Sequence, residues 1–332
     1  MHGYIGLDGN QVIPPIYEFG TFFRDGIAAV KLNNKMRFIS TSGETVLETD
    51  YFSAGNFSCG RALFLSKNGK FGYLDMQGEI VIPPTFDYAY DFSDGYATIH
   101  VRKGTSTGRA FIDVNGNFIH DQIHTNSMHF RDGIASVEHS SGKHGCINAA
   151  GEYVIEPISD SYIFFSEGLA PISIKGKIGY MDRKGEIVIP PRFGYAGNFH
   201  DGIAIIIKRN KCGYINKLGE IIIEPKFNDA EDFYEQLAPV KVGRSWGYIN
   251  PEGEFEIEPK YTGASCFIEG IASVHEKKNI KLMKRNMEMI DLGEQYERLD
   301  YFSEGLSCVT LREKRKPYPI TSHTSVVRFY AP

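Results

Sequence analysis

The stretch GYMDRKGEIVIPPRF, residues 179–193, returns in nearly the same form at three other places in the chain. The related stretches are GYLDMQGEIVIPPTF at 72–86, GYINKLGEIIIEPKF at 213–227 and GYINPEGEFEIEPKY at 247–261. An enzyme needs its catalytic motif once, whereas a repeated structural unit supplies the same stretch many times. The sequence therefore predicts a tandem repeat, in which this stretch is a structural unit and not an active site.

A Phe-x-x-Gly segment marks each copy of the repeat, and we number the copies by these markers. Their spacing of 34 to 38 residues gives nine copies, with marker positions Gly26, Gly60, Gly95, Gly133, Gly168, Gly202, Gln236 (in the glycine position), Gly270 and Gly305. Each marker follows a Phe by three residues and precedes an Ala, or Ser307 in the last copy, by two. Large rings and small residues in register are what stacked neighbours need to share one core.

Each copy reads as three short β-strands, and helical periodicity is absent. LAPVKV (237–242) alternates apolar and polar residues, GYIN (247–250) is aromatic and β-branched, and EIVIPP (186–191) is an apolar strand that the prolines should end. The segment from Asp182 to Gly185 suits a tight hairpin closed by a left-handed glycine. The predicted fold class is all-β, with nine tandem three-stranded units in residues 1–314 and a tail or cap in 315–332.

Two arrangements of these units fit the sequence. In a closed, propeller-like toroid, GLSCVTL (305–311) would pair with the N-terminal hairpin GYIGLDGNQVIPP (3–15). In an open, curved solenoid the two ends would need caps. The last copy has KLM (281–283) in place of the GYI strand and lacks the hairpin glycine, as a terminal cap would. We therefore expect the open solenoid.

The repeated unit resembles the WG-repeat family, also called KWG repeats and best known from bacteria. The resemblance rests on G-x-A-x-V, K-x-G-Y-I-D-x-x-G-x-x-V-I-P-P and F-x-x-A-x-x-F-S-E-G, and it covers about residues 3–313. The Trp-Gly pair that names the family survives only at Trp246 and Gly247. The resemblance implies a tandem β-repeat protein used for interactions, with no family-wide catalytic residues.

Charge and hydropathy argue against nucleic-acid and membrane partners. The net charge is -5, and there is no long run of basic residues of the kind that binds phosphate backbones. No apolar run approaches the roughly 20 residues that cross a bilayer, and the N-terminus lacks the features of a signal peptide. We expect a cytoplasmic protein with neither kind of partner.

Residue types that could carry chemistry have a structural interpretation in this chain. The five cysteines form no C-x-x-C motif and are expected to be buried free thiols. His120, His124 and His129 could hold a metal only if all three converged, and His124 occupies an aromatic core position. One acid per copy, at a fixed position, indicates turn chemistry: Asp25, Asp94, Asp132, Glu167, Asp201, Glu269 and Glu304. We expect no enzymatic activity, no cofactor and no metal.

Copy four departs furthest from the repeat, so it is the predicted partner-binding region. FIHDQIHTNSM (118–128) replaces the Pro-Pro strand, and an insertion-like segment, RKGTSTGR, occupies 102–109. Residues that read a ligand tend to vary between copies while the framework repeats. The partner-binding candidates are Arg102, Lys103, Arg109 and His120.

The function expected from the sequence is that of a non-enzymatic binding scaffold for another protein, acting through an extended repeat surface. A glycan or small-ligand binding module is one alternative, although a single Trp counts against it. An immunity or inhibitor-type protein acting on a partner enzyme is another.

Overall fold

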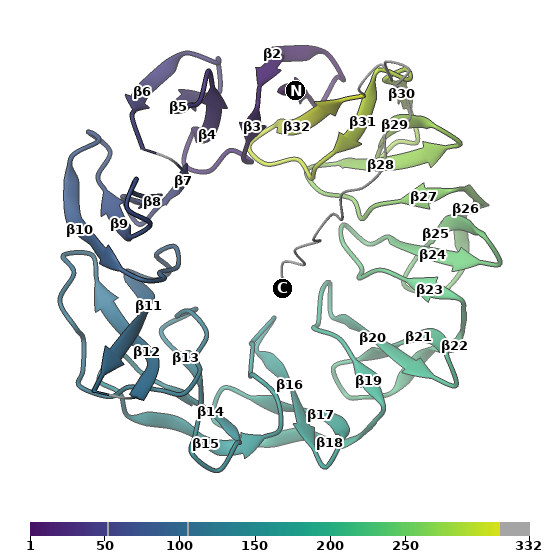
Figure 1. The fold of residues 1–332 in the computed structure, drawn as a ribbon. Coiled ribbons are helices and arrows are strands. Elements are labelled where there is room, and N and C mark those ends of the chain that lie inside the picture. The colour runs from purple at the N-terminus through teal and green to yellow at the C-terminus, as the bar shows by residue number, and fades with distance from the viewer. Residues whose placement is uncertain (52, 105, 313–332) are drawn as a thin grey trace, which may run out of the picture.

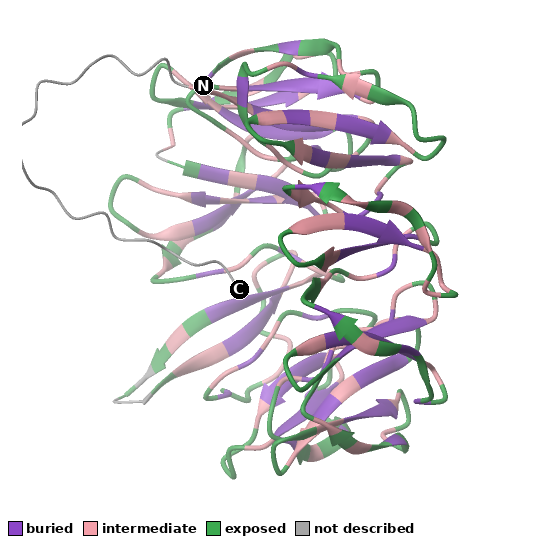
Figure 2. Ribbon diagram, turned by 90° about the vertical axis from the view of Figure 1, so that its right-hand side faces the viewer, coloured by how far each residue is buried: buried purple, intermediate pink, exposed green. Residues whose placement is uncertain are grey.

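The computed structural model describes residues 1–51, 53–104 and 106–312, and the fold in this part of the chain is all-β. Its strands form nine separate antiparallel sheets, arranged around an open centre (Figure 1). Figure 2 shows that buried residues follow the strands, whereas exposed residues concentrate at the turns. The described residues include no helix of the length and apolarity that spanning a membrane requires.

Most sheets contain four strands that follow one another in space as they do in the chain. The first two sheets comprise β3 (Phe19–Gly20), β4 (Ile27–Leu32), β5 (Lys35–Ser40) and β6 (Thr45–Thr49), then β7 (Ser53–Ser58), β8 (Arg61–Leu65), β9 (Phe71–Leu74) and β10 (Ile80–Phe86). The next three comprise β11 (Tyr96–Lys103) and β12 (Ser106–Asp113), then β13 (Ala135–Glu138), β14 (His144–Ile147) and β15 (Tyr153–Ser159), then β16 (Leu169–Ile174), β17 (Lys177–Asp182) and β18 (Ile187–Phe193).

The remaining sheets keep the same plan. The sixth and seventh comprise β19 (Tyr195–Ala196), β20 (Ile203–Lys208), β21 (Lys211–Asn216) and β22 (Ile221–Phe227), then β23 (Asp229–Ala230), β24 (Ala238–Val242), β25 (Ser245–Ile249) and β26 (Phe255–Tyr261). The eighth comprises β27 (Gly263–Ala264), β28 (Ile271–Glu276), β29 (Asn279–Lys284) and β30 (Met289–Asp291). The ninth, which we call the closing sheet, comprises β1 (His2–Gly6), β2 (Gln11–Tyr17), β31 (Tyr296–Leu299) and β32 (Leu306–Leu311). Three strands per copy were expected, and the six four-stranded sheets add a strand that leads into the framework Phe or, in β7, includes it.

The recurring Gly-Tyr and Pro-Pro segments belong together because the two strands approach each other closely. A Cβ atom on Gly213 would lie 2.5 Å from the carbonyl oxygen of Ile223 and 2.6 Å from the nitrogen of Pro225, so only glycine fits. The pairing of β21 with β22 shifts register between Cys212 and Tyr214, beside the proline. Proline lacks a donor, but it is tolerated in an edge strand at such an irregularity. The strands therefore continue through the prolines, contrary to the expectation that they end there.

The repeated aromatic and small residues form the core, as the sequence predicted. All nine Phe residues that precede the markers are buried, and so are the eight Ala residues and Ser307. In the sixth sheet the Tyr214 ring packs edge-on against Phe233, with the centroids 4.9 Å apart. The Tyr214 hydroxyl donates to the carbonyl oxygen of Glu231 at 2.9 Å. One copy thereby contributes both packing and a hydrogen bond to the next.

The acids that precede the markers lie in tight turns, as predicted, and most of them also connect neighbouring copies. Both turn residues have positive φ, for example Asp201 at 51° and Gly202 at 78°, which is the geometry of a mirror-image hairpin turn. Most of the acid side chains accept a hydrogen bond from the backbone N–H of the next turn. The pairs are Asp94 with Gly133, Glu167 with Gly202, Asp201 with Gln236, Glu235 with Gly270, Glu269 with Gly305, and Glu304 with Gly26.

The two ends of the array meet in the closing sheet, so they are not the free ends that the expected open solenoid would have. β1 pairs with β32 in unbroken register from His2 with Thr310 to Gly6 with Leu306. This is the pairing given above as the alternative. An open array would leave both strands as unpaired edges, whereas pairing satisfies their backbone groups.

The degenerate last copy is not a cap. KLM (281–283) lies within β29, which pairs with β28 and β30 like the equivalent strands elsewhere. Met287 takes the left-handed turn position, at φ 67°, where a glycine stands in other copies. The expected tail or cap, 315–332, lies outside the described residues.

Candidate functional site

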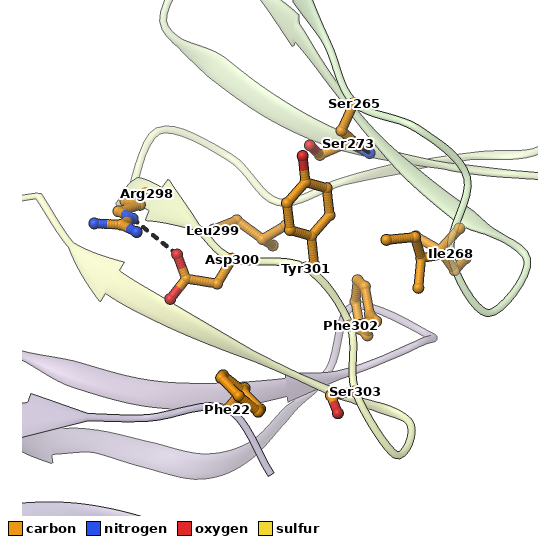
Figure 3. A pocket seen from close by; sticks show the side chains of 11 residues that line it. Phe22, Ser265, Ile268, Ser273, Arg298, Leu299, Asp300, Tyr301, Phe302 and Ser303 are labelled. Carbon is orange, nitrogen blue, oxygen red and sulfur yellow. Dashed lines mark hydrogen bonds and ion pairs between the residues drawn. The ribbon is translucent and has the colours of Figure 1, made fainter. Parts of the chain in front are cut away.

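A pocket of about 590 Å³ lies where the eighth sheet meets the closing sheet. Its walls come from the segment between β31 and β32, from β28 and the segment before it, and from Phe22 beyond β3 (Figure 3). This volume is within the range typical of ligand sites. The pocket exists because the two ends of the chain come together, since Phe22 and Tyr301 are far apart in sequence.

Two aromatic side chains at the pocket are exposed. Tyr301 is 59% exposed and Phe22 is 51% exposed, although both directly precede a buried framework Phe. In Figure 3 the Tyr301 ring extends toward Ser265 and Ser273, with Phe302 close to its base. An exposed Tyr beside hydroxyl groups combines an apolar face with a polar tip, which is the residue type that anchors binding interfaces.

Polar groups lie at one end of the pocket. Arg298 donates from Nε to the Asp300 carboxylate at 2.8 Å, and its side chain remains 74% exposed. Ser265 is engaged locally, because its hydroxyl accepts from the backbone N–H of Ser273 at 2.9 Å and donates to the carbonyl oxygen of Cys266. An exposed ion pair of this kind contributes little to stability, so both partners can exchange it for a ligand group.

A second polar cluster adjoins the pocket through Cys266. The Cys266 thiol donates to the carbonyl oxygen of Asp232 at 3.3 Å, and the Asp232 carboxylate lies 3.6 Å from Nε2 of His200. Burial raises the pKa of Asp232, and the nearby His200 partly opposes this shift. Tyr234 packs on His200 with the ring centroids 4.6 Å apart. We call this cluster, together with the pocket, the seam patch.

Several residues of the seam patch occupy the position immediately before a framework Phe, which varies from copy to copy. The residues immediately before the nine Phe are Phe22, Asn56, Asp91, His129, Phe164, Asn198, Asp232, Cys266 and Tyr301. The sequence therefore contained a signal for this site, in a variable position beside an invariant one. Attention to the irregular copy four missed it.

The predicted partner-binding residues differ in their exposure and in their contacts. Arg102, near the end of β11, is exposed, whereas the side chain of Lys103 lies outside what the structure describes. Arg109 is half-buried: its guanidinium donates to the carbonyl oxygen of Ser127 and lies over the Tyr90 ring, 5.3 Å from the centroid. The guanidinium of Arg109 therefore already has partners within the protein. The partner-binding role of all four residues stays a prediction.

The histidines of the same region pack against the core. His124 is 7% exposed, and its ring meets His120 edge-on with the centroids 5.7 Å apart. Burial lowers the pKa of His120 and lowers that of His124 to about 4, so both are neutral at neutral pH. His129 is exposed. Within residues 1–51, 53–104 and 106–312, no three His, Cys, Asp or Glu side chains form a group that could hold a metal ion.

The cysteines occupy the positions expected of structural thiols, with one exception. Cys146, Cys212, Cys266 and Cys308 are buried, and burial raises the pKa of Cys146, Cys266 and Cys308 to about 12. Cys59 is exposed, because it replaces the acid in the turn of copy two and accepts there from the N–H of Gly95.

Repeated sheets built from one sequence unit define a tandem β-repeat protein, and comparison with known families gives the particular class. The model of the WG containing repeat matches residues 3–35, 36–71, 71–100, 145–177, 178–212, 213–244 and 246–277. These segments cover more than half of the chain, so the chain belongs to the WG-repeat family. The model skips 101–144, which includes the irregular segment of copy four, and ends before the degenerate last copy.

Several solved structures match the chain at low sequence identity. "Crystal structure of the eukaryotic initiation factor" is 11% identical, with a TM-score of 0.57, and the match covers 87% of this chain and 95% of that chain. BamB from Moraxella catarrhalis is 11% identical with a TM-score of 0.45, covering 95% and 98%, and the computationally designed Ika8 protein is 14% identical with a TM-score of 0.46, covering 79% and 94%. No curated protein matches the sequence.

Proposed function

We propose that the chain is a closed, propeller-type ring of nine copies that acts as a non-enzymatic scaffold and binds a protein partner at the seam patch. The observation that carries this proposal is the exposure of Tyr301 and Phe22 at one pocket, at a position of the repeat that varies between copies. Framework residues are committed to the core, so partner recognition falls to such variable positions.

The extent of the seam patch favours a protein partner. It runs from His200 in copy six to Phe22 in copy one, and a specific interface needs about 800 Å² on each side, which one copy does not supply. Interface energy concentrates on a few aromatic anchors, and Tyr301 and Phe22 are suited to that role. Acids outnumber permanently charged cations in the patch, which holds Asp232 and Asp300 but only Arg298, so the partner segment should be basic.

A glycan or another small ligand is the second candidate. The Tyr301 ring lies above a pocket of about 590 Å³ that also presents Asp300 and Ser265. Aromatic faces next to carboxylates and hydroxyls are suited to sugars. In this case a fragment that fits the pocket would bind alone, without contacts to His200 or Asp232.

The test is affinity capture from native lysate with mass spectrometry, comparing the parent with the double variant Phe22→Ser and Tyr301→Ala. Tyr195→Ala is the matched control, because Tyr195 is 52% exposed and does not line the pocket. We expect the double variant to lose a partner that the control retains, and a glycan array to remain blank. Capture that depends on Arg102 and not on Tyr301 would place the site in copy four and contradict the proposal.

A further inference from the structure

A second cavity, of about 670 Å³, lies between the fifth and sixth sheets and outside the seam patch. Its apolar wall includes Phe193, Ile206, Ile207 and Ile221. Ile207 is 36% exposed and Ile221 is 38% exposed, so part of this wall faces solvent. An apolar group that covered this wall would remove apolar surface from water, which favours binding.

Cations surround this apolar wall. Lys177, Arg192, Lys208 and Arg209 line the cavity together with one acid, Glu220, which leaves a net charge of +3. Arg192 is already engaged, because its guanidinium donates to the carbonyl oxygen of Gly219 and lies over Phe193. In the described part of the chain, no carboxylate forms an ion pair with the other three cations.

The repeat framework does not require this charge. Six residues after the marker, where the sixth sheet has Lys208, five other copies have apolar residues, namely Leu32, Val101, Ile174, Val242 and Leu311. Arg209 adopts φ 52° in the hairpin that follows, a conformation that disfavours a long side chain and occurs at Gly243 in the seventh sheet. The sixth sheet therefore carries two adjacent cations at a position where neither packing nor turn geometry selects them.

We propose that this cavity, which we call the cationic groove, binds a single-chain amphiphile with an anionic head, namely a long-chain carboxylate. The acyl chain would lie on Ile207, Ile221 and Phe193, and the carboxylate would meet Lys208 and Arg209. Arg pairs with a carboxylate through two parallel hydrogen bonds, and Lys177 adds a further positive charge. The site is independent of the proposed partner-binding function.

Isothermal titration calorimetry with dodecanoate, below its micelle-forming concentration, tests the proposal. Dodecanol and acetate serve as probes for the chain alone and the head alone. We expect dodecanoate to bind at one site and both other probes to bind at least about tenfold more weakly. Equal binding of dodecanol would remove the role of the cations, and absence of dodecanoate binding would overturn the proposal.

The double variant Lys208→Ala and Arg209→Ala should weaken dodecanoate binding about tenfold or more. The matched control is Lys277→Ala with Lys278→Ala, which removes two cations from the equivalent hairpin of the eighth sheet and should bind like the parent. Circular dichroism confirms that both variants fold. If the two double variants bind equally, the amphiphile does not use the cationic groove. Ile221→Asp should also abolish binding if the acyl chain lies where proposed.

Discussion

The closing sheet and the sixth sheet have equivalent strand orders, but only the sixth sheet comes from a single continuous segment of the chain. The sixth sheet is built from one continuous stretch, 195–227, whereas the closing sheet joins 2–17 to 296–311. Both use the same interactions: the Tyr4 hydroxyl donates to the carbonyl of Thr21 at 2.7 Å, as that of Tyr214 does to Glu231. The same contacts between copies therefore form whether or not the chain is continuous through the sheet. Bringing the two distant ends together costs more conformational entropy than forming a sheet from one segment.

Removal of residues 1–17 should have the largest effect, because it takes two strands from the closing sheet and none from the sixth. Tyr4, Ile13 and Tyr17 are buried there, and each is worth about 1.5–3 kcal/mol. We expect the unfolding free energy to fall by about 5 kcal/mol or more. Cys308, now 2% exposed, should become reactive.

Thiol labelling with mass spectrometry makes the measurement, and Cys212 in the sixth sheet is the internal control. It should stay protected after the truncation, because its own sheet is intact. Protection of Cys308 together with an unchanged unfolding midpoint would show that the ends do not pair in solution.

Phe23→Ala in the closing region should cost about as much as Phe199→Ala or Phe233→Ala in the regular region. Each ring is fully buried, and a large-to-small change of this kind costs about 3–5 kcal/mol. Urea unfolding followed by circular dichroism gives the values. A cost for Phe23 far below the other two would mean that the closing core is loosely packed, and unchanged stability of all three would refute the assigned repeat register.

Tyr4→Phe and Tyr214→Phe compare the contribution of one equivalent hydrogen bond in the closing sheet and in the sixth sheet. Each variant keeps the buried ring and leaves a carbonyl without its donor, so we expect a loss of about 1–2 kcal/mol at both sites. The same unfolding assay applies, and Phe57→Leu can calibrate its response to a change confined to packing. A loss confined to Tyr214 would indicate that water satisfies the Thr21 carbonyl in the closing sheet.

Glu304→Ala and Glu235→Ala should have the smallest effects. Each removes an exposed hydrogen bond to the next turn, at Gly26 and Gly270 respectively, and each should cost about 0.5–1 kcal/mol. Glu297→Ala is the control, since Glu297 is exposed and belongs to no such turn. A larger loss at Glu304 than at Glu235 would show that the turn contact contributes more at the closure than inside the array.

Much of the core could be predicted from the sequence because the same pattern of Phe and Ala residues recurs along the chain. The Phe before each marker is buried in every copy, and the acids lie in the turns that their fixed spacing indicated. The choice between an open and a closed array could not be made in this way. Local patterns are identical in both, and the decisive pairing joins His2 to Thr310, far apart in the chain.

The candidate site was harder to predict because a residue can depart from the repeat pattern for two different reasons. In copy four, Arg109 and His124 differ from the repeat because they fill space and satisfy a carbonyl where a regular strand is missing. Tyr301 also differs from its counterparts, but its side chain is largely exposed. Burial distinguishes a residue that fills the core from one that is exposed for binding. The sequence alone does not show which of the departing residues is buried.

The antiparallel pairing of β1 with β32 also determines how the ring would respond to mechanical tension. Residues 1 and 311 lie at the same end of this ladder, where the backbone N–H of Leu311 donates to the carbonyl of Met1. A force that pulls these two residues apart therefore acts on one rung at a time, from His2 and Thr310 inward to Gly6 and Leu306. The closure would peel open at low force, although the same bonds, loaded together along the strands, would resist as a group.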